Sequence, residues 1–145
     1  MKKGHVLFIA IAGITAYFHL TGNSNLLQEA QAANADVNPQ LGQICKATAA
    51  MSFGRDYKIM KLDKVDANGV AYVHYIRSLD NTRWAIKCRL EGDRVIWASN
   101  NPDSTGRWRN DPADETITYS INGKKLNLKQ VYSDGSGDNA TYDLK

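Results

Sequence analysis

The segment from Asn100 to Glu115 holds the residues whose types and spacing are best suited to binding chemistry. It contains the run Arg107-Trp108-Arg109, and tryptophan and arginine are the residue types most enriched at protein-binding hot spots. Two guanidinium groups beside an indole ring are able to hold a carboxylate, a phosphate or an aromatic ring. The same alternation is typical of a short edge strand with the tryptophan inward and both arginines in solvent. We take these three residues as the candidate binding site.

Three carboxylates, Asp111, Asp114 and Glu115, follow directly and offer an alternative chemistry. Paired carboxylates are able to exchange protons with a substrate or to bind calcium. Next to Arg107 and Arg109, however, they are expected to form local ion pairs. The sequence shows no partner or pocket that would position them, so a small hydrolase using them is the weaker alternative. We therefore predict no catalytic residue, no cofactor and no metal site.

A second candidate surface consists of four basic residues along the segment 82–99. They are Arg83, Lys87, Arg89 and Arg94, called here the basic stripe. Such a stripe suits an anionic partner such as phospholipid, polysaccharide or an acidic protein. The ordinary interpretation is a solvated sheet face whose charges prevent edge-to-edge association. We expect no aromatic residues to be interleaved with the stripe, and we predict no binding of nucleic acid.

The first 32 residues have the organisation of an export signal. Two lysines precede an apolar run from Val6 to Leu20. As a helix this run would span about 22 Å, which is short of a hydrocarbon core of roughly 30 Å. Small residues up to Ala32 offer a cleavage site, so we predict a signal peptide over 1–32 and a linker over 33–38. The long polar stretch before the cleavage site leaves an uncleaved signal anchor as the alternative.

Export decides the chemistry of the two cysteines, Cys45 and Cys88. Outside the cytoplasm, two cysteines without a CxxC motif are most simply one structural disulfide. The loop of about 44 residues that this bond closes would stabilise the fold by roughly 4 kcal/mol. We therefore predict a disulfide that joins the segment around Cys45 to the strand that carries Cys88.

One helix is predicted at the start of a single globular domain over 39–145. Pro39 suits the first turn of this helix, Asn38 is a good N-cap and Gly54 is a good C-terminal cap. The residues that share one face at a period of 3.6 are Leu41, Ile44, Cys45, Thr48 and Ser52. Because Cys45 lies within this face, the disulfide would hold the helix against a sheet.

After Gly54 the apolar pattern changes to a period of two, and tight turns separate the predicted strands. A two-residue turn at Gly92-Asp93 places Cys88 opposite Trp97. The inner face then contains Trp84, Ile86, Cys88, Leu90, Val95 and Trp97. The basic stripe lies on the opposite face, which we expect to face solvent.

Two further hairpins and a last strand, which follows a turn over 134–137, complete the pattern. A type I′ turn at Asn122-Gly123 pairs Tyr119 with Leu126 and gives one apolar and one polar face. In the earlier hairpin, a four-residue loop over 66–69 keeps the faces consistent. This register brings together Met60, Leu62, Val73 and Tyr75.

These elements predict an α+β fold that is mainly β. One N-terminal helix packs on an antiparallel meander of about seven or eight short strands, and one disulfide ties the helix to the sheet. The sheet forms a twisted sheet or half-barrel. A closed β-barrel with the helix as a plug is the alternative.

Composition places few limits on function. The 145 residues carry a formal charge of +3, which is far below the density typical of nucleic-acid-binding domains. We predict a non-enzymatic, exported interaction protein of the bacterial cell envelope, such as an inhibitor or accessory subunit, with an envelope or extracellular protein as partner. The alternative is a carrier of a small apolar ligand in a pocket lined by Trp84, Trp97 and Tyr119. The predicted location is periplasmic or secreted. An uncleaved N-terminal segment would instead anchor the protein in the inner membrane, facing the periplasm, and would be its one membrane contact.

Overall fold

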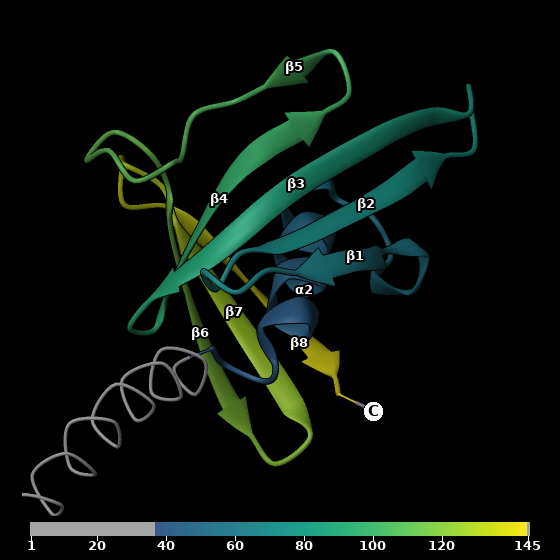
Figure 1. The fold of residues 1–145 in the computed structure, drawn as a ribbon. Coiled ribbons are helices and arrows are strands. Elements are labelled where there is room, and N and C mark those ends of the chain that lie inside the picture. The colour runs from purple at the N-terminus through teal and green to yellow at the C-terminus, as the bar shows by residue number, and fades with distance from the viewer. Residues whose placement is uncertain (1–36, 145) are drawn as a thin grey trace, which may run out of the picture. The chain divides into compact units, whose positions relative to one another are not determined.

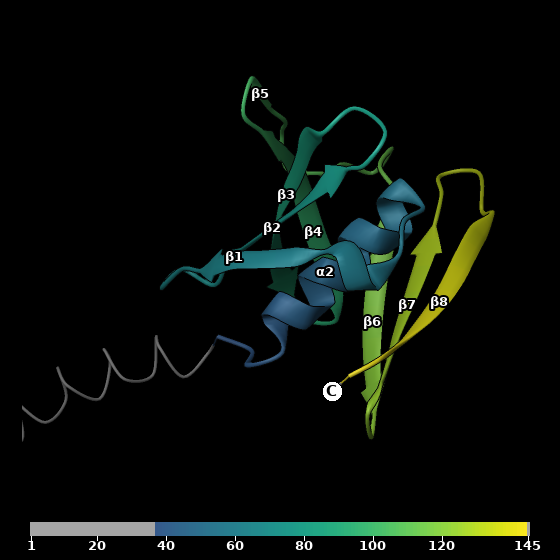
Figure 2. The same ribbon diagram turned by 90° about the vertical axis from the view of Figure 1, so that its right-hand side faces the viewer.

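One α-helix lies in the trough of a long antiparallel sheet (Figures 1 and 2). The computed structural model describes residues 37–144, so the predicted signal peptide lies outside the described residues. The elements in chain order are α2 (Leu41–Phe53), the 3-10 helix η1 (Tyr57–Ile59), β1 (Lys61–Val65), β2 (Ala71–Arg77), β3 (Thr82–Glu91), β4 (Arg94–Asn101), β5 (Ser104–Thr105), β6 (Thr116–Asn122), β7 (Lys125–Val131) and β8 (Gly137–Asp143).

The sheet is a meander in which each strand pairs with its neighbour in sequence. Its order is β1-β2-β3-β4-β6-β7-β8, all pairs are antiparallel, and the short β5 pairs with the end of β4. Within residues 37–144, β1 and β8 are the two edges and do not pair with each other. The predicted half-barrel with one helix is therefore confirmed, and the barrel is not closed.

A narrow junction divides the sheet into two parts. Only Arg94–Thr118 and Val95–Ile117 pair between β4 and β6. We call β1–β4 the first wing and β6–β8 the second wing; α2 lies between them (Figure 2). Both wings contribute to one core, which includes Ile44, Val73, Ile86, Ile117, Leu126 and Leu128.

The helix is buried on more than the one face that its periodicity predicts. Ala47, Ala49 and Ala50 are also buried, because the wings enclose the helix from two sides. It begins at Leu41, two residues later than expected, since the Asn38 side chain accepts a hydrogen bond from the Gln40 amide in the turn before it.

The C-terminal cap of the helix agrees with the sequence prediction. Gly54 adopts a left-handed conformation with φ of 63°, which suits a residue without a Cβ. The Arg55 amide donates to the Ala50 carbonyl at 2.9 Å, and the Gly54 amide donates to the Met51 carbonyl at 3.4 Å. These two bonds form a Schellman motif that ends α2.

The predicted disulfide between Cys45 and Cys88 is confirmed. It joins the middle of α2 to β3, and both cysteines are fully buried. Cys88 pairs with Trp97, as the Gly92-Asp93 turn predicted. Gly92 has φ of 61°, which fits a type II′ turn with glycine first.

The predicted register of the β6–β7 hairpin is wrong by two residues. The turn is Gly123-Lys124 rather than Asn122-Gly123, so Tyr119 pairs with Leu128. Gly123 has φ of 61° and takes the first central position of a type II′ turn, as Gly92 does. A shift of two residues leaves every side chain on its predicted face, because the period of a strand is two.

The β1–β2 hairpin differs from its prediction by one bulge. Leu62 pairs with Val73 as expected, but the register shifts between Leu62 and Lys64. Asp63 is therefore the extra residue, and the loop covers 66–70. The Asp66 carboxylate accepts hydrogen bonds from two amides of this loop, which stabilises the longer turn.

Candidate functional site

The candidate binding residues lie in a loop that follows the free edge of β4. The Gly106 amide donates to the Ser99 carbonyl, and the Arg109 amide donates to the Trp97 carbonyl, both at 2.9 Å. The loop thus extends the pairing of β4 beyond its short contact with β6. Side chains of an extended segment alternate between the two faces, so Trp108 points away from its arginine neighbours.

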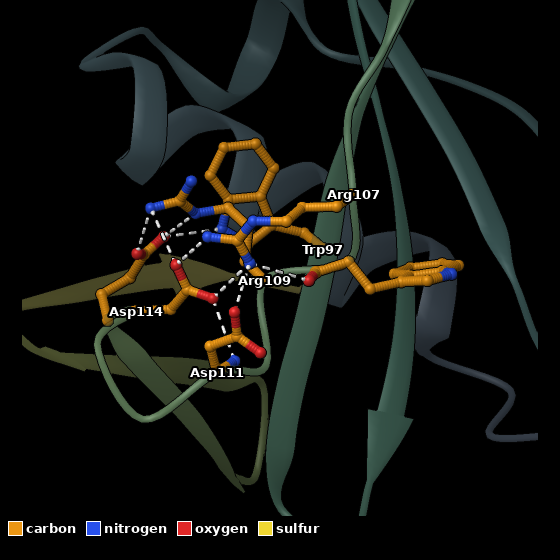
Figure 3. A network of polar contacts seen from close by, with 7 residues as sticks. Trp97, Arg107, Arg109, Asp111 and Asp114 are labelled. Carbon is orange, nitrogen blue, oxygen red and sulfur yellow. Dashed lines mark hydrogen bonds and ion pairs between the residues drawn. The ribbon is translucent and has the colours of Figure 1, made fainter.

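Arg107 makes a two-point ion pair with Asp114 (Figure 3). The two nitrogen–oxygen distances are 2.7 and 2.8 Å, and the Asp114 side chain is only 5% exposed. The Asp111 amide donates a third hydrogen bond to this carboxylate at 3.0 Å. The bonds from Arg107 are the largest cause that lowers the pKa of Asp114 far below its ordinary value.

Arg109 makes a second pair of the same kind with Glu115. Its nitrogens lie 2.8 and 2.7 Å from the Glu115 oxygens. The indole nitrogen of Trp97 donates to the same carboxylate at 3.1 Å, and the Arg109 guanidinium lies 5.2 Å from the Trp97 ring centre. Burial is the largest single cause and acts to raise the pKa of Glu115. The hydrogen bonds from Arg109, Trp97 and the backbone, together with the charge of Arg109, outweigh it, so the pKa is lowered.

These contacts make the carboxylates structural acceptors. Asp114 and Glu115 both stay ionised at neutral pH, which is unfavourable for a general acid. Asp111 is 64% exposed and lies 3.5 Å from Arg107. The loop therefore gives no support to the hydrolase alternative. Within residues 37–144, no cluster of three or more His, Cys, Asp or Glu side chains is placed to hold a metal ion.

Trp108 reaches the outer face of the sheet and joins the two candidate surfaces. Lys87 Nζ lies 4.8 Å from the Trp108 ring centre, and the Arg89 guanidinium lies 4.7 Å from it. Both distances are within the range of cation–π contacts. The Arg107–Arg109 site and the basic stripe were separate in the sequence interpretation, and here they meet at this ring.

A second aromatic residue extends this arrangement across the first wing. Tyr72 pairs with Lys87 across the strands, and Lys64 Nζ lies 4.7 Å from the Tyr72 ring centre. Cations and aromatic rings therefore alternate on the outer face. We call this set the outer ladder; its members are Lys64, Tyr72, Lys87, Trp108 and Arg89. The expectation that no aromatic residue is interleaved with the basic stripe is wrong.

Sequence reasoning did not assign Lys64 and Tyr72 to a site. The alternation of Tyr72 with the buried residues Ala71 and Val73 was a usable signal for the face of Tyr72. Its position beside Lys87 depends on the β2–β3 register, which no short turn motif in the sequence fixed.

The other two residues of the basic stripe, Arg83 and Arg94, have different environments. Arg83 donates to Asp63 at 2.9 Å, and Asp63 also contacts His74 at 2.7 Å. Arg94 lies at the junction of the wings, and its Nε is buried without a hydrogen-bond partner among the described residues. The Nε atom of Arg89 is also buried without a hydrogen-bond partner among the described residues.

The outer face is not simply solvated, contrary to expectation. Ile96 and Ala98 lie between the basic residues and are 1% and 0% exposed. Trp108 and the cations that it contacts lie on this same face, so the loop that carries Trp108 covers part of the face and buries it.

The aromatic residues of the predicted apolar pocket take part in packing. Trp84 and Trp97 both pack edge-on against Phe53 of α2, at 6.1 and 6.2 Å between ring centres. The Tyr119 hydroxyl accepts a hydrogen bond from Asn38 at 3.1 Å. None of these three lines the groove of about 840 Å³ that lies between η1–β1 and β8.

Comparison with known proteins finds no match to this chain among family models, curated proteins or solved structures. Its function is therefore argued from the site alone. The disulfide is typical of an oxidising compartment outside the cytoplasm. Over residues 37–144 there is no helix with the length and apolar character needed to cross a membrane.

Proposed function

We propose that this protein is a non-enzymatic interaction protein of the bacterial cell envelope that binds another protein through the outer ladder, with Arg107 contributing from the opposite side of the loop that carries Trp108. It is exported to the periplasm or secreted, and it acts as an inhibitor or accessory subunit of its partner. The disulfide supports export, and the charged, aromatic outer face supports binding.

One observation carries this proposal: Trp108 lies against Lys87 and Arg89 on the outer face. The contact combines a tryptophan with two cations in one position, which is the composition of a binding hot spot. Arg107 lies beside Trp108 in the chain and is 58% exposed. Its guanidinium is fixed by Asp114, so it loses little conformational freedom when a partner binds.

The chemistry of the outer ladder indicates the kind of partner surface. Three of its five members are cations, and its two rings offer flat apolar area. An acidic protein surface with an exposed aromatic or arginine side chain would complement both properties. Binding is then expected to weaken with salt, because exposed charges are screened.

The test is in-cell crosslinking of the tagged full chain at its native level. The wild type is compared with Trp108→Ala, which removes a half-buried ring, and with the control Leu79→Ala, which removes an apolar side chain that is 88% exposed and is not part of the ladder. We expect one envelope protein to be crosslinked by the wild type and the control and to be lost in Trp108→Ala. Circular dichroism checks that all three fold.

Two results would overturn the proposal. The first is a crosslinked protein that is retained by a Trp108→Ala/Arg107→Ala double variant. The second is no crosslinked protein at all with the folded wild type, which would favour a small ligand or a catalytic role.

A further inference from the structure

The two free edges of the half-barrel face a shared groove. The groove has a volume of about 840 Å³ and lies between η1–β1 on one side and β8 on the other. Lys46 of α2, Tyr57 of η1 and Tyr142 of β8 are among the residues that line it. The rings of Tyr57 and Tyr142 lie 5.5 Å apart, so an aromatic pair bridges the two sides.

The edge strand β1 is unusually exposed for a strand that carries apolar residues. All five of its residues are exposed. Along η1 and β1, Ile59, Leu62 and Val65 are 41%, 43% and 39% exposed. Unpaired backbone groups next to exposed apolar side chains form a template for another strand.

The pairing order leaves room for an added strand at β1. β1 is an edge of the sheet and pairs on one side alone, with β2. One further strand, antiparallel to β1, would therefore extend the first wing.

The charges around the groove select the chemistry of that strand. Lys46, Lys58 and Lys61 line it, together with Asp56 and Asp143. Asp143 contacts Lys125, and the Asp56 carboxylate accepts a hydrogen bond from the Lys58 amide at 2.9 Å. The carboxylates are thus largely engaged, and the groove favours an acidic segment.

A second copy of this chain fits the edge less well. Antiparallel pairing of β1 with the β1 of another copy would bring lysines from both strands together, since Lys61 and Lys64 belong to this short strand. Like charges opposite each other destabilise a strand pair.

We propose that β1 accepts an extended segment of a partner protein, in which apolar and acidic residues alternate, as an antiparallel strand. The backbone of β1 supplies the hydrogen bonds, and the exposed apolar side chains and groove lysines select the sequence. This site shares Lys64 with the outer ladder but uses the free backbone edge of β1 and the groove, and it does not depend on Trp108.

The test uses synthetic peptides with blocked ends and the folded domain. The probe is a heptapeptide of alternating valine and glutamate, used below the concentration at which it self-associates. One control peptide has lysine in place of glutamate, and another has alternate backbone amides methylated. Calorimetry measures affinity, and hydrogen exchange measures protection of the β1 amides.

We expect the glutamate peptide to bind and to slow exchange over 61–65, and both control peptides to bind at least about tenfold more weakly. The double variant Lys58→Glu/Lys61→Glu reverses the charge of the groove and should weaken binding by about tenfold. The matched control Lys124→Glu/Lys129→Glu changes the net charge equally at two positions that do not line the groove, and it should bind as the wild type does. Thermal unfolding verifies that each variant folds.

Several outcomes would overturn the proposal. They are no binding, equal binding of the lysine peptide, binding without protection of β1, and no effect of the groove variant. A concentration-dependent dimer that protects β1 without peptide would assign the edge to a second copy. Trp108→Ala should bind the peptide normally, so failure here is distinguishable from failure of the outer ladder.

Discussion

Asp114 shows how the candidate loop keeps a charge in an almost enclosed position. Its side chain is 5% exposed, and a buried carboxylate is stable only when its oxygens are paired. Arg107 provides two hydrogen bonds and the Asp111 amide provides a third. The ionised form of Asp114 is therefore one of the contacts that hold the loop conformation, beside the Arg109–Glu115 pair.

The first prediction concerns pH. The pKa of Asp114 is lower in the folded state than in the unfolded state, so this group stabilises the fold above about pH 4 and the contribution is lost as pH falls below that value. Asp114→Asn should lower the free energy of unfolding at pH 7. It should also reduce the loss of stability between pH 5 and pH 2, measured by urea unfolding. An unchanged pH dependence would contradict this account.

At the scale of residues, the sequence predicted that ion pairs form in this loop but did not predict which arginine pairs with which carboxylate. The closeness of two arginines and three carboxylates correctly indicated ion pairs. It did not indicate that Arg107 binds Asp114, seven residues away, or that Arg109 binds Glu115. Those choices depend on the path of the loop along β4, which is set by contacts distant in sequence.

At the scale of elements, the second prediction concerns the bond between α2 and β3. Replacing Cys45 and Cys88 together with alanine should lower the free energy of unfolding by roughly 4 kcal/mol, because the unfolded chain gains conformational freedom. Denaturant unfolding of the oxidised wild type and the double variant gives this difference. Reductant should destabilise the wild type and leave the variant unchanged; equal sensitivity of both would contradict the prediction.

The third prediction compares one substitution at two glycines. Gly92→Ala should destabilise by about 1 kcal/mol, because φ of 61° at that turn is unfavourable with a Cβ. Gly42→Ala lies within α2, where alanine is favoured by roughly 1 kcal/mol, but its Cβ would lie 2.5 Å from Leu62 Cδ2. That methyl group is able to move, so the net effect there should be near zero. Thermal unfolding of both variants measures the contrast.

Turn chemistry accounts for what was predictable in the hairpins. Glycine before aspartate at 92–93 indicated a type II′ turn, and the register that this turn predicted for the β3–β4 hairpin is confirmed. The Asn122-Gly123 pair favoured a turn one residue early, since asparagine-glycine suits type I′ while the fold uses type II′. The bulge at Asp63 adds one residue to β1, and no turn motif in the sequence indicates it. Apolar and polar residues alternate regularly from Met60 up to this position.

At the scale of the whole molecule, the fourth prediction concerns the unequal anchoring of the wings. The first wing holds the disulfide and the main contacts of α2, whereas two residue pairs join the second wing to β4. Amide exchange at low denaturant should therefore give lower opening free energies for β6–β8 than for β2–β4. Equal values in both wings would show that the junction and the shared core make them one cooperative unit.

The half-barrel was predictable because tight turns between successive strands favour a meander, and the disulfide placed the helix on its inner face. The sequence did not exclude the alternative of a closed barrel. Closure depends on the summed twist of seven strands and on the helix between the wings, and neither is visible in local patterns.

The covalent link between Cys45 and Cys88 also decides how the domain would respond to tension. A pull on its two ends passes along the chain to Cys45, crosses the sulfurs and continues from Cys88, so β1 and β2 lie off the loaded path. β8, at the C-terminal end, would detach first, followed by the rest of the second wing. The domain would lengthen from one side and keep the strand-accepting edge folded under load.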